Sequence, residues 1–174
     1  MMRITGGRQR ARWSRVAAVL TVVLTLAACS SSVGPTEPSG AQTTSEIEYQ
    51  LFRLANRERE GNGARPELVL DQGLSAIARQ YSELMRDQGF FSHVAPDGST
   101  LKRRLEIAGI GYSSAGENIA QVTHAGDPAV LAHDLLMDSR RHRANILDSD
   151  YQEVGMGVAR SRDTFWITQV FVSP

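Results

Sequence analysis

The chain of 174 residues contains a single cysteine, Cys29, and a single lysine, Lys102. One cysteine cannot form a disulfide within the chain, so the stability of the fold must come from an apolar core. Apolar residues make up 41% of the sequence and charged residues 22%, which suits a packed domain and excludes a wholly disordered or collagen-like chain. The length is that of one ordinary domain.

The sequence also has little basic charge outside its first residues. Acidic and basic side chains number 19 each, but residues 1–28 contain five arginines and no acid, which leaves 14 basic against 19 acidic groups in the remainder. Nucleic-acid binding depends on basic side chains that neutralise phosphates, so we expect no nucleic acid as a partner. Neither a glycine-rich phosphate loop nor a dinucleotide fingerprint is present, so nothing supports nicotinamide or ATP chemistry.

Residues 1–28 have the layout of an export signal. The apolar run at residues 16–28 is shorter than the roughly 20 residues of a membrane-spanning helix, and a basic stretch precedes it. The following Leu26-Ala27-Ala28-Cys29 resembles the lipobox of bacterial lipoproteins, whose cysteine is acylated and becomes the mature N-terminus. This resemblance implies lipidation of Cys29, attachment to a membrane and a location in the cell envelope, outside the cytoplasm. The alternative is a plain secretory signal that is cut nearby, with Cys29 incidental.

The chain downstream of Cys29 divides into a tether and a folded domain. Residues 29–44 are rich in Ser, Thr, Pro and Gly, with one branched apolar residue, so they cannot bury enough surface to offset the entropy cost of ordering. We therefore predict a flexible tether over residues 29–44 and one domain over residues 45–174.

Helix caps and apolar spacing outline the elements of this domain. We predict helices that begin at a Ser45–Glu48 capping box, at Asp71, at Thr100 and at Asp127-Pro128. Strands are predicted over residues 119–122, 154–158 and 165–172, with a polar turn at 160–164 that joins the last two into a hairpin. Helices first and strands later indicate an α+β fold with helices packed on an antiparallel sheet.

Three separated residues could form a metal site. His93 lies in a loop between two predicted helices, Glu117 directly precedes an apolar strand-like run, and His142 lies in the segment 139–147. Two imidazoles and one carboxylate suit Zn²⁺ or another divalent cation, provided that the fold brings them together. The alternative is a loop histidine, a solvated glutamate and a helix-end histidine that the negative pole of the helix dipole stabilises. The other two histidines, His124 and His133, are expected to be ordinary surface or boundary residues.

Several ordered motifs resemble those of one known family, and they span residues 46–172. They are Leu54-Ala55-Asn56-Arg57-Glu58-Arg59, Phe91-Ser92-His93, Gly116-Glu117-Asn118-Ile119-Ala120, Ser139 with His142-Arg143 and Asn145-Ile146-Leu147, Gly155-Met156-Gly157-Val158 and Trp166-Ile167-Thr168-Gln169. This series resembles the bacterial branch of the CAP superfamily, the SCP-like proteins that include cysteine-rich secretory proteins, antigen 5 and pathogenesis-related proteins.

The resemblance implies an α-β-α sandwich with a central antiparallel sheet and a large cleft. It also implies that His93, Glu117 and His142 line the cleft floor and can hold a divalent metal such as Zn²⁺. A second glutamate that completes this set in many family members falls on Ser139, so the set is incomplete here. Asn118, Ser139 and Asn145 are expected to support the cleft, with the Asn118 amide bonding to backbone in a turn.

Three functions remain open from the sequence. The first is a binding module whose cleft holds a lipid, a peptide or a peptidoglycan fragment above a metal-dependent polar floor. The second is a metal-dependent hydrolase of amides or esters outside the cytoplasm, with a Ser139–His142 pair as a variant because helical residues three apart share a face. The third is a structural interaction protein of the envelope, whose cleft has no chemical role.

Overall fold

A computed structural model describes residues 42–123 and 126–174. The predicted export signal, Cys29, most of the predicted tether and His124 lie outside the described residues. Among the helices of the described residues, none combines the length and hydropathy that crossing a bilayer requires.

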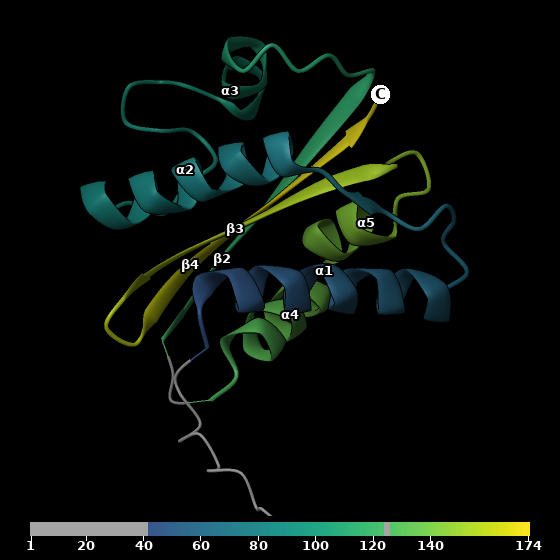
Figure 1. The fold of residues 1–174 in the computed structure, drawn as a ribbon, viewed down its shortest axis with the longest axis horizontal. Coiled ribbons are helices and arrows are strands. Elements are labelled where there is room, and N and C mark those ends of the chain that lie inside the picture. The colour runs from purple at the N-terminus through teal and green to yellow at the C-terminus, as the bar shows by residue number, and fades with distance from the viewer. Residues whose placement is uncertain (1–41, 124–125) are drawn as a thin grey trace, which may run out of the picture. The chain divides into compact units, whose positions relative to one another are not determined.

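The described residues form a four-stranded sheet with helices on both faces (Figure 1). The elements in chain order are α1 (Thr44–Gly61), β1 (Val69–Leu70), α2 (Gln72–Gln88), α3 (Leu101–Ile107), β2 (Ser114–Thr123), α4 (Pro128–Asp138), α5 (Arg140–Leu147), β3 (Glu153–Ser161) and β4 (Thr164–Ser173). Helices α2 and α3 cover one face, while α1, α4 and α5 cover the other. This arrangement confirms the predicted α+β class and the α-β-α layering.

The sheet has the strand order β1-β3-β4-β2 and is mixed rather than purely antiparallel. Strands β3 and β4 and strands β4 and β2 pair antiparallel, but β1 pairs parallel with β3, with Val69 opposite Glu153. No strand was among those predicted between the first two helices. Two paired residues carry no periodicity of their own, and this strand exists only because the Val69 N–H donates to the Gln152 carbonyl and the Asp71 N–H to the Val154 carbonyl.

Helix α1 begins two residues earlier than its predicted capping box. Thr43 is the N-cap: its hydroxyl accepts from the Glu46 N–H, and the Glu46 carboxylate accepts from the Thr43 N–H. The Ser45–Glu48 box was therefore wrong, although both pairs fit the pattern. Glu48 instead lies buried, ion-paired with Arg79 and accepting from the Val158 N–H, so tertiary contacts decide between the two caps.

Strand pairing extends further than apolar alternation predicted. Strand β2 begins at Ser114, five residues before the expected start, because its polar residues pair one by one with β4. The β3–β4 hairpin likewise closes with a two-residue turn, Arg162 and Asp163, in which Arg162 has a φ of 53°. As a result, Glu117 lies within a strand, opposite Val170, rather than before one.

Two glycines allow α2 to approach the sheet closely. A Cβ atom added to Gly155 would lie 2.1 Å from the backbone carbon of Leu74, and one added to Gly157 would lie 2.1 Å from that of Ala78. Only glycine therefore fits at both positions of β3. The close packing fixes α2, and with it the loop that leaves the end of α2 toward His93.

Candidate functional site

Three segments that are distant in sequence bring the predicted site residues together. His93 lies in the loop between α2 and α3, Glu117 lies in β2, and His142 lies in the first turn of α5. His93 Nδ1 is 2.9 Å from Glu117 Oε1, and the His93 and His142 ring centroids are 6.4 Å apart. The His93 side chain is 52% exposed, whereas that of Glu117 is 4% exposed. A buried carboxylate therefore orients an imidazole at the surface.

Arg104 of α3 is a member of this site that sequence reasoning missed. Its Nη2 donates to Glu117 Oε2, and its guanidinium carbon lies 3.4 Å from the centroid of the Tyr81 ring. Tyr81 in turn donates its hydroxyl to the carbonyl of Ser92, 2.6 Å away, next to His93. Burial raises the pKa of Tyr81, which keeps this hydroxyl protonated as a donor.

A sequence signal for Arg104 did exist. Arg104 lies three residues after Leu101 and one before the fully buried Leu105, so the helical period turns it toward the sheet rather than toward solvent. A mostly buried arginine requires a partner, and the carboxylate of Glu117 is the one that the fold supplies.

The dipole alternative placed His142 at the C-terminal end of a helix, but His142 lies at the N-terminal end of α5. Ser139 has extended backbone, with a ψ of 116°, so it ends α4 and precedes α5. His142 therefore lies near the positive pole of α5, which does not favour a protonated ring. Its pKa is lowered by burial and, to a smaller extent, by the charge of His93.

Ser139 makes no hydrogen bond to His142 among the described residues, and its side chain makes no capping hydrogen bond to α5. The hypothesis of a hydrolase that uses a Ser139–His142 pair assumed that both residues lie in one helix. That premise was wrong, because the chain bends at Ser139 before α5 begins.

Asn118 joins α5 to the sheet. It is 0% exposed, and its Nδ2 donates to the His142 carbonyl and to Gln169 Oε1, each at 3.0 Å. Its Oδ1 accepts from Asn145 Nδ2 at 2.8 Å, and Asn145 also donates to the Glu117 carbonyl at 3.3 Å. Asn118 bonds to backbone as expected, but from a strand rather than from a turn. These amides fix the backbone of both His142 and Glu117.

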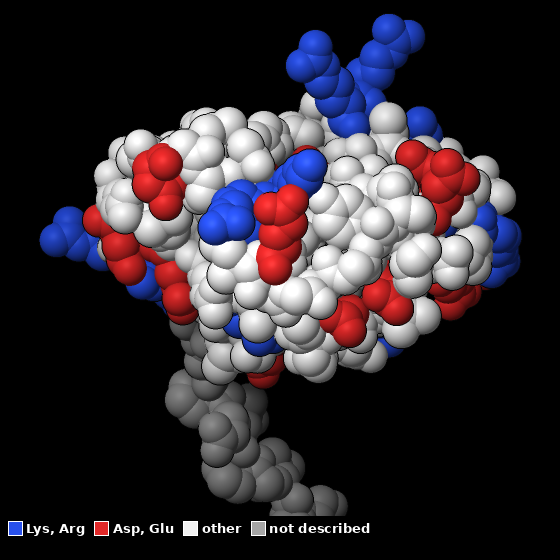
Figure 2. All heavy atoms as spheres, turned by 90° about the horizontal axis from the view of Figure 1, so that it is seen from above, with Lys and Arg blue, Asp and Glu red and all other residues white. Residues whose placement is uncertain are grey.

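An open cavity of about 470 Å³ lies beside His93 and Glu117. Its lining combines apolar and aromatic side chains with hydrogen-bonding ones. The lining residues are His93, Val94, Thr100, Leu101, Lys102, Tyr112, Ala115, Gly116 and Glu117. Figure 2 looks onto the face covered by α2 and α3, where acidic and basic side chains lie scattered among uncharged surface.

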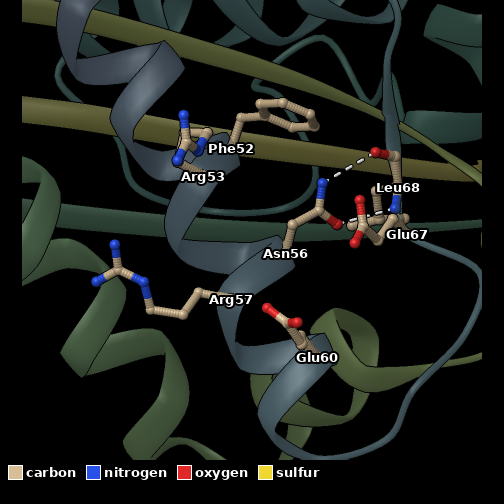
Figure 3. A pocket seen from close by; sticks show the side chains of 7 residues that line it. All are labelled: Phe52, Arg53, Asn56, Arg57, Glu60, Glu67 and Leu68. Carbon is tan, nitrogen blue, oxygen red and sulfur yellow. Dashed lines mark hydrogen bonds between the residues drawn. The ribbon is translucent and has the colours of Figure 1, made fainter.

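A second cavity, of about 380 Å³, contains none of the predicted site residues. Its lining comes from α1 and the segment before β1, namely Phe52, Arg53, Asn56, Arg57, Glu60, Glu67 and Leu68 (Figure 3). Asn56 donates to the Leu68 carbonyl at 3.0 Å and accepts from the Leu68 N–H at 2.8 Å. The Asn56 amide therefore makes the two backbone hydrogen bonds that a neighbouring strand would make with Leu68, so its role is structural.

His93, Glu117 and His142 converge without presenting three donors to one point. Within the described ranges, no group of three His, Cys, Asp or Glu side chains is arranged to hold a metal ion. Each oxygen of Glu117 already accepts from a neighbour, His93 or Arg104. Two imidazoles on one tetrahedral Zn²⁺ would also have centroids roughly 5 Å apart, closer than the 6.4 Å found here. The donor set therefore does not fit a three-ligand metal centre in this arrangement.

The chain thus belongs to the class of α-β-α sandwich domains in which a strand glutamate and two histidines lie close together. Residues 52–171 match the family model described as CAP, the cysteine-rich secretory protein family. The chain belongs to this family.

Relatives and a solved structure agree with this assignment. The chain is 34% identical over 137 residues to the uncharacterized protein YkwD of Bacillus subtilis (strain 168), covering 79% of this chain and 51% of YkwD. It is 37% identical over 131 residues to the uncharacterized membrane protein YlbC of the same strain, covering 75% of this chain and 35% of YlbC. An extracellular SCP-domain protein from Bacillus anthracis str. Ames superposes with a TM-score of 0.67 and 31% identity, covering 78% of this chain and 45% of that one. The chain thus spans about half the length, or less, of these relatives.

Proposed function

We propose that this protein is a ligand-binding module of the cell envelope, anchored to a membrane through lipidated Cys29. Its ligand carries an apolar group and a hydrogen-bonding group, as a lipid, a peptide or a peptidoglycan fragment does. One observation carries the proposal: an exposed imidazole, oriented by a buried carboxylate, lines a cavity together with the apolar side chains of Val94 and Leu101.

The proposed location rests on the sequence and on the relatives. Leu26-Ala27-Ala28-Cys29 and the basic, then apolar, stretch before it favour export and acylation. YlbC is described as a membrane protein, and the Bacillus anthracis protein as extracellular. Both descriptions support a place of action outside the cytoplasm.

The imidazole of His93 favours a ligand that donates a hydrogen bond. Because the Glu117 carboxylate accepts from His93 Nδ1, the proton of the neutral ring resides on Nδ1 and Nε2 is an acceptor. Arg104 balances the charge of Glu117, and Lys102, which also lines the cavity, can donate to a carbonyl or carboxylate of the ligand. A hydroxyl or amide N–H on the ligand matches Nε2, and Val94, Leu101 and Tyr112 match its apolar part.

The binding test compares the full-length wild type with His93→Ala and with Leu101→Asp, using a stem-peptide muropeptide and a long-chain fatty acid as probes in calorimetry. We expect both substitutions to weaken the binding of the recognised probe at least about tenfold. Arg53→Ala, in the second cavity, is the matched control and should bind as the wild type does. The proposal would be refuted if the wild type bound neither probe, or if both cavity variants bound the recognised probe with the affinity of the wild type.

A hydrolase is the second candidate, favoured by the His93–Glu117 hydrogen bond itself. An imidazole oriented by a carboxylate is the arrangement of a general base, and His93 Nε2 would take a proton from an attacking water. Turnover of an amide or ester substrate that disappears in His93→Ala and decreases in Glu117→Gln would support this candidate. If turnover persists in His93→Ala, it does not arise from this site. A purely structural role predicts that His93→Ala leaves the cellular phenotype intact.

A further inference from the structure

We propose that Arg104 takes the place of a metal ion at this site: its guanidinium holds Glu117 as an internal counter-ion, and Glu117 is a positioning residue for His93 rather than a metal ligand. This inference rests on the proposed function only in that both concern the same site. Its test measures metal affinity, which does not require the ligand to be known.

The contacts of Glu117 carry the first step. The carboxylate is 4% exposed and has one charged or polar partner for each oxygen, Arg104 on Oε2 and His93 on Oε1. A divalent cation would need at least one of these oxygens. It would therefore have to compete with the guanidinium and the imidazole for a carboxylate whose two oxygens both already accept a hydrogen bond and whose charge a buried cation already balances.

The surroundings of Arg104 carry the second step. The side chain is 12% exposed, and Glu117 is the only hydrogen-bond partner of its guanidinium among the described residues, since the buried Nε and Nη1 atoms have none. A metal that took over Glu117 would leave this cation buried and unpaired, which is strongly unfavourable. A nearby metal would also repel the guanidinium directly.

Tyr81 holds Arg104 in this position. The central carbon of the guanidinium lies over the Tyr81 ring, 3.4 Å from the ring centroid, a favourable cation–π contact. The same tyrosine anchors the loop that carries His93 through its hydrogen bond to Ser92. Moving Arg104 aside would therefore disturb the platform on which the loop rests, which further favours the metal-free state.

Zinc calorimetry on the full-length chain tests the role of Glu117. If Glu117 is not a ligand, the wild type and Glu117→Gln bind Zn²⁺ with affinities that agree within about twofold, or neither binds. A Zn²⁺ affinity at least about tenfold weaker in Glu117→Gln than in the wild type would overturn the proposal. Circular dichroism of both proteins establishes that they are folded.

Releasing Glu117 tests the role of Arg104. Arg104→Met keeps an apolar chain against Tyr81 but removes the cation, so we expect Zn²⁺ to bind at least about tenfold more tightly than to the wild type and to shift the ring signals of His93 in NMR spectra. Arg103→Met, at an exposed neighbour on α3 that pairs with Glu106, is the matched control and should change neither.

A folded Arg104→Met protein without gain in Zn²⁺ affinity overturns the proposal. If Arg104→Met does not fold, the comparison of the wild type with Glu117→Gln decides the question alone. Failure of the ligand screens would refute the proposed function without altering either Zn²⁺ result, and a Glu117-dependent Zn²⁺ site would refute this inference without altering the ligand screens.

Discussion

Asn118 joins three segments of chain through one buried amide. Replacement by alanine would remove the donor to the His142 carbonyl and to Gln169 Oε1 and one of the two acceptors of Asn145, and unsatisfied buried groups are costly. We expect Asn118→Ala to lower the free energy of unfolding by about 2 to 4 kcal/mol in urea denaturation. Asn62→Ala, which removes an exposed amide at the end of α1, should change it by less than about 0.5 kcal/mol. Equal effects of the two substitutions would contradict this role.

His133 is buried rather than at the surface or boundary where we expected it. It is 3% exposed in α4, and neither ring nitrogen has a hydrogen-bond partner among the described residues. Burial lowers its pKa, while Glu58, whose Oε1 lies 3.8 Å from Nε2, opposes that shift in part, as does Asp134. The apolar residues around it in α4 gave no reason to distinguish a buried from a boundary position.

This burial predicts acid sensitivity. A histidine whose pKa is lowered on folding binds protons more readily when unfolded, so its contribution to stability is complete above the unfolded pKa of about 6.5 and is lost as the pH falls below it. His133→Leu should therefore flatten the decline in melting temperature between about pH 6.5 and pH 5. His142, whose pKa is also lowered, contributes with the same sign, so the substitution is best made in a His142→Ala background. An unchanged slope would contradict the prediction.

At the scale of elements, the contact between β3 and α2 depends on two glycines. Gly155→Ala would bring a methyl group to 2.1 Å from the α2 backbone, which cannot be relieved by a side-chain rotation. We expect a loss of at least about 3 kcal/mol in unfolding free energy, or no folded protein. Gly61→Ala is the matched control, because nothing lies within 4 Å of its added Cβ and alanine favours a helix. A Gly155→Ala protein as stable as the wild type would refute the close approach.

The ends of elements were predictable where a local cap determines them. Asp71 caps α2 and Asp127 caps α4, as the sequence indicated, and Gly89 ends α2 with a φ of 66°. Strand β1 was not predictable, because it has two residues and depends on its partner β3. The start of α1 was ambiguous for a similar reason, since two capping pairs exist and distant contacts of Glu48 exclude one of them.

The candidate site was predictable only in part. Resemblance to a family pointed to His93, Glu117 and His142, which the fold does bring together. Arg104 escaped notice because it lies among other charged residues in a short helix and resembles a solvated side chain. The helical period placed it on the inward face of α3, but its pairing with Glu117 depends on the packing of α3 against β2, a tertiary feature that has no short-range signature. For the same reason, the prediction of a metal from the donor types took no account of the ion pair between Arg104 and Glu117.

At the scale of the whole molecule, Arg59 links α1 to a connection that lies 87 to 92 residues further along the chain. It is fully buried in α1, and its guanidinium donates to four backbone carbonyls, those of Pro66, Ile146, Asp148 and Tyr151. Within the part of the chain that the structure describes, no carboxylate accepts a hydrogen bond from it. Burial lowers its pKa and the charge of Asp148 opposes this shift in part, so carbonyl dipoles supply its direct partners. These bonds join α1 to the segment before β1 and to the connection between α5 and β3.

Replacing Arg59 should therefore destabilise the domain as a unit rather than one element. Arg59→Met leaves the carbonyls without donors, so we expect a loss of about 3 to 5 kcal/mol in unfolding free energy by urea denaturation. Arg59→Lys should recover little, because an ammonium group cannot reach carbonyls that the planar guanidinium contacts from both sides. Arg57→Ala, an exposed arginine of the same helix, serves as the control and should cost less than about 0.5 kcal/mol. If Arg59→Lys is as stable as the wild type, charge alone suffices and the geometric role assigned to the guanidinium is wrong.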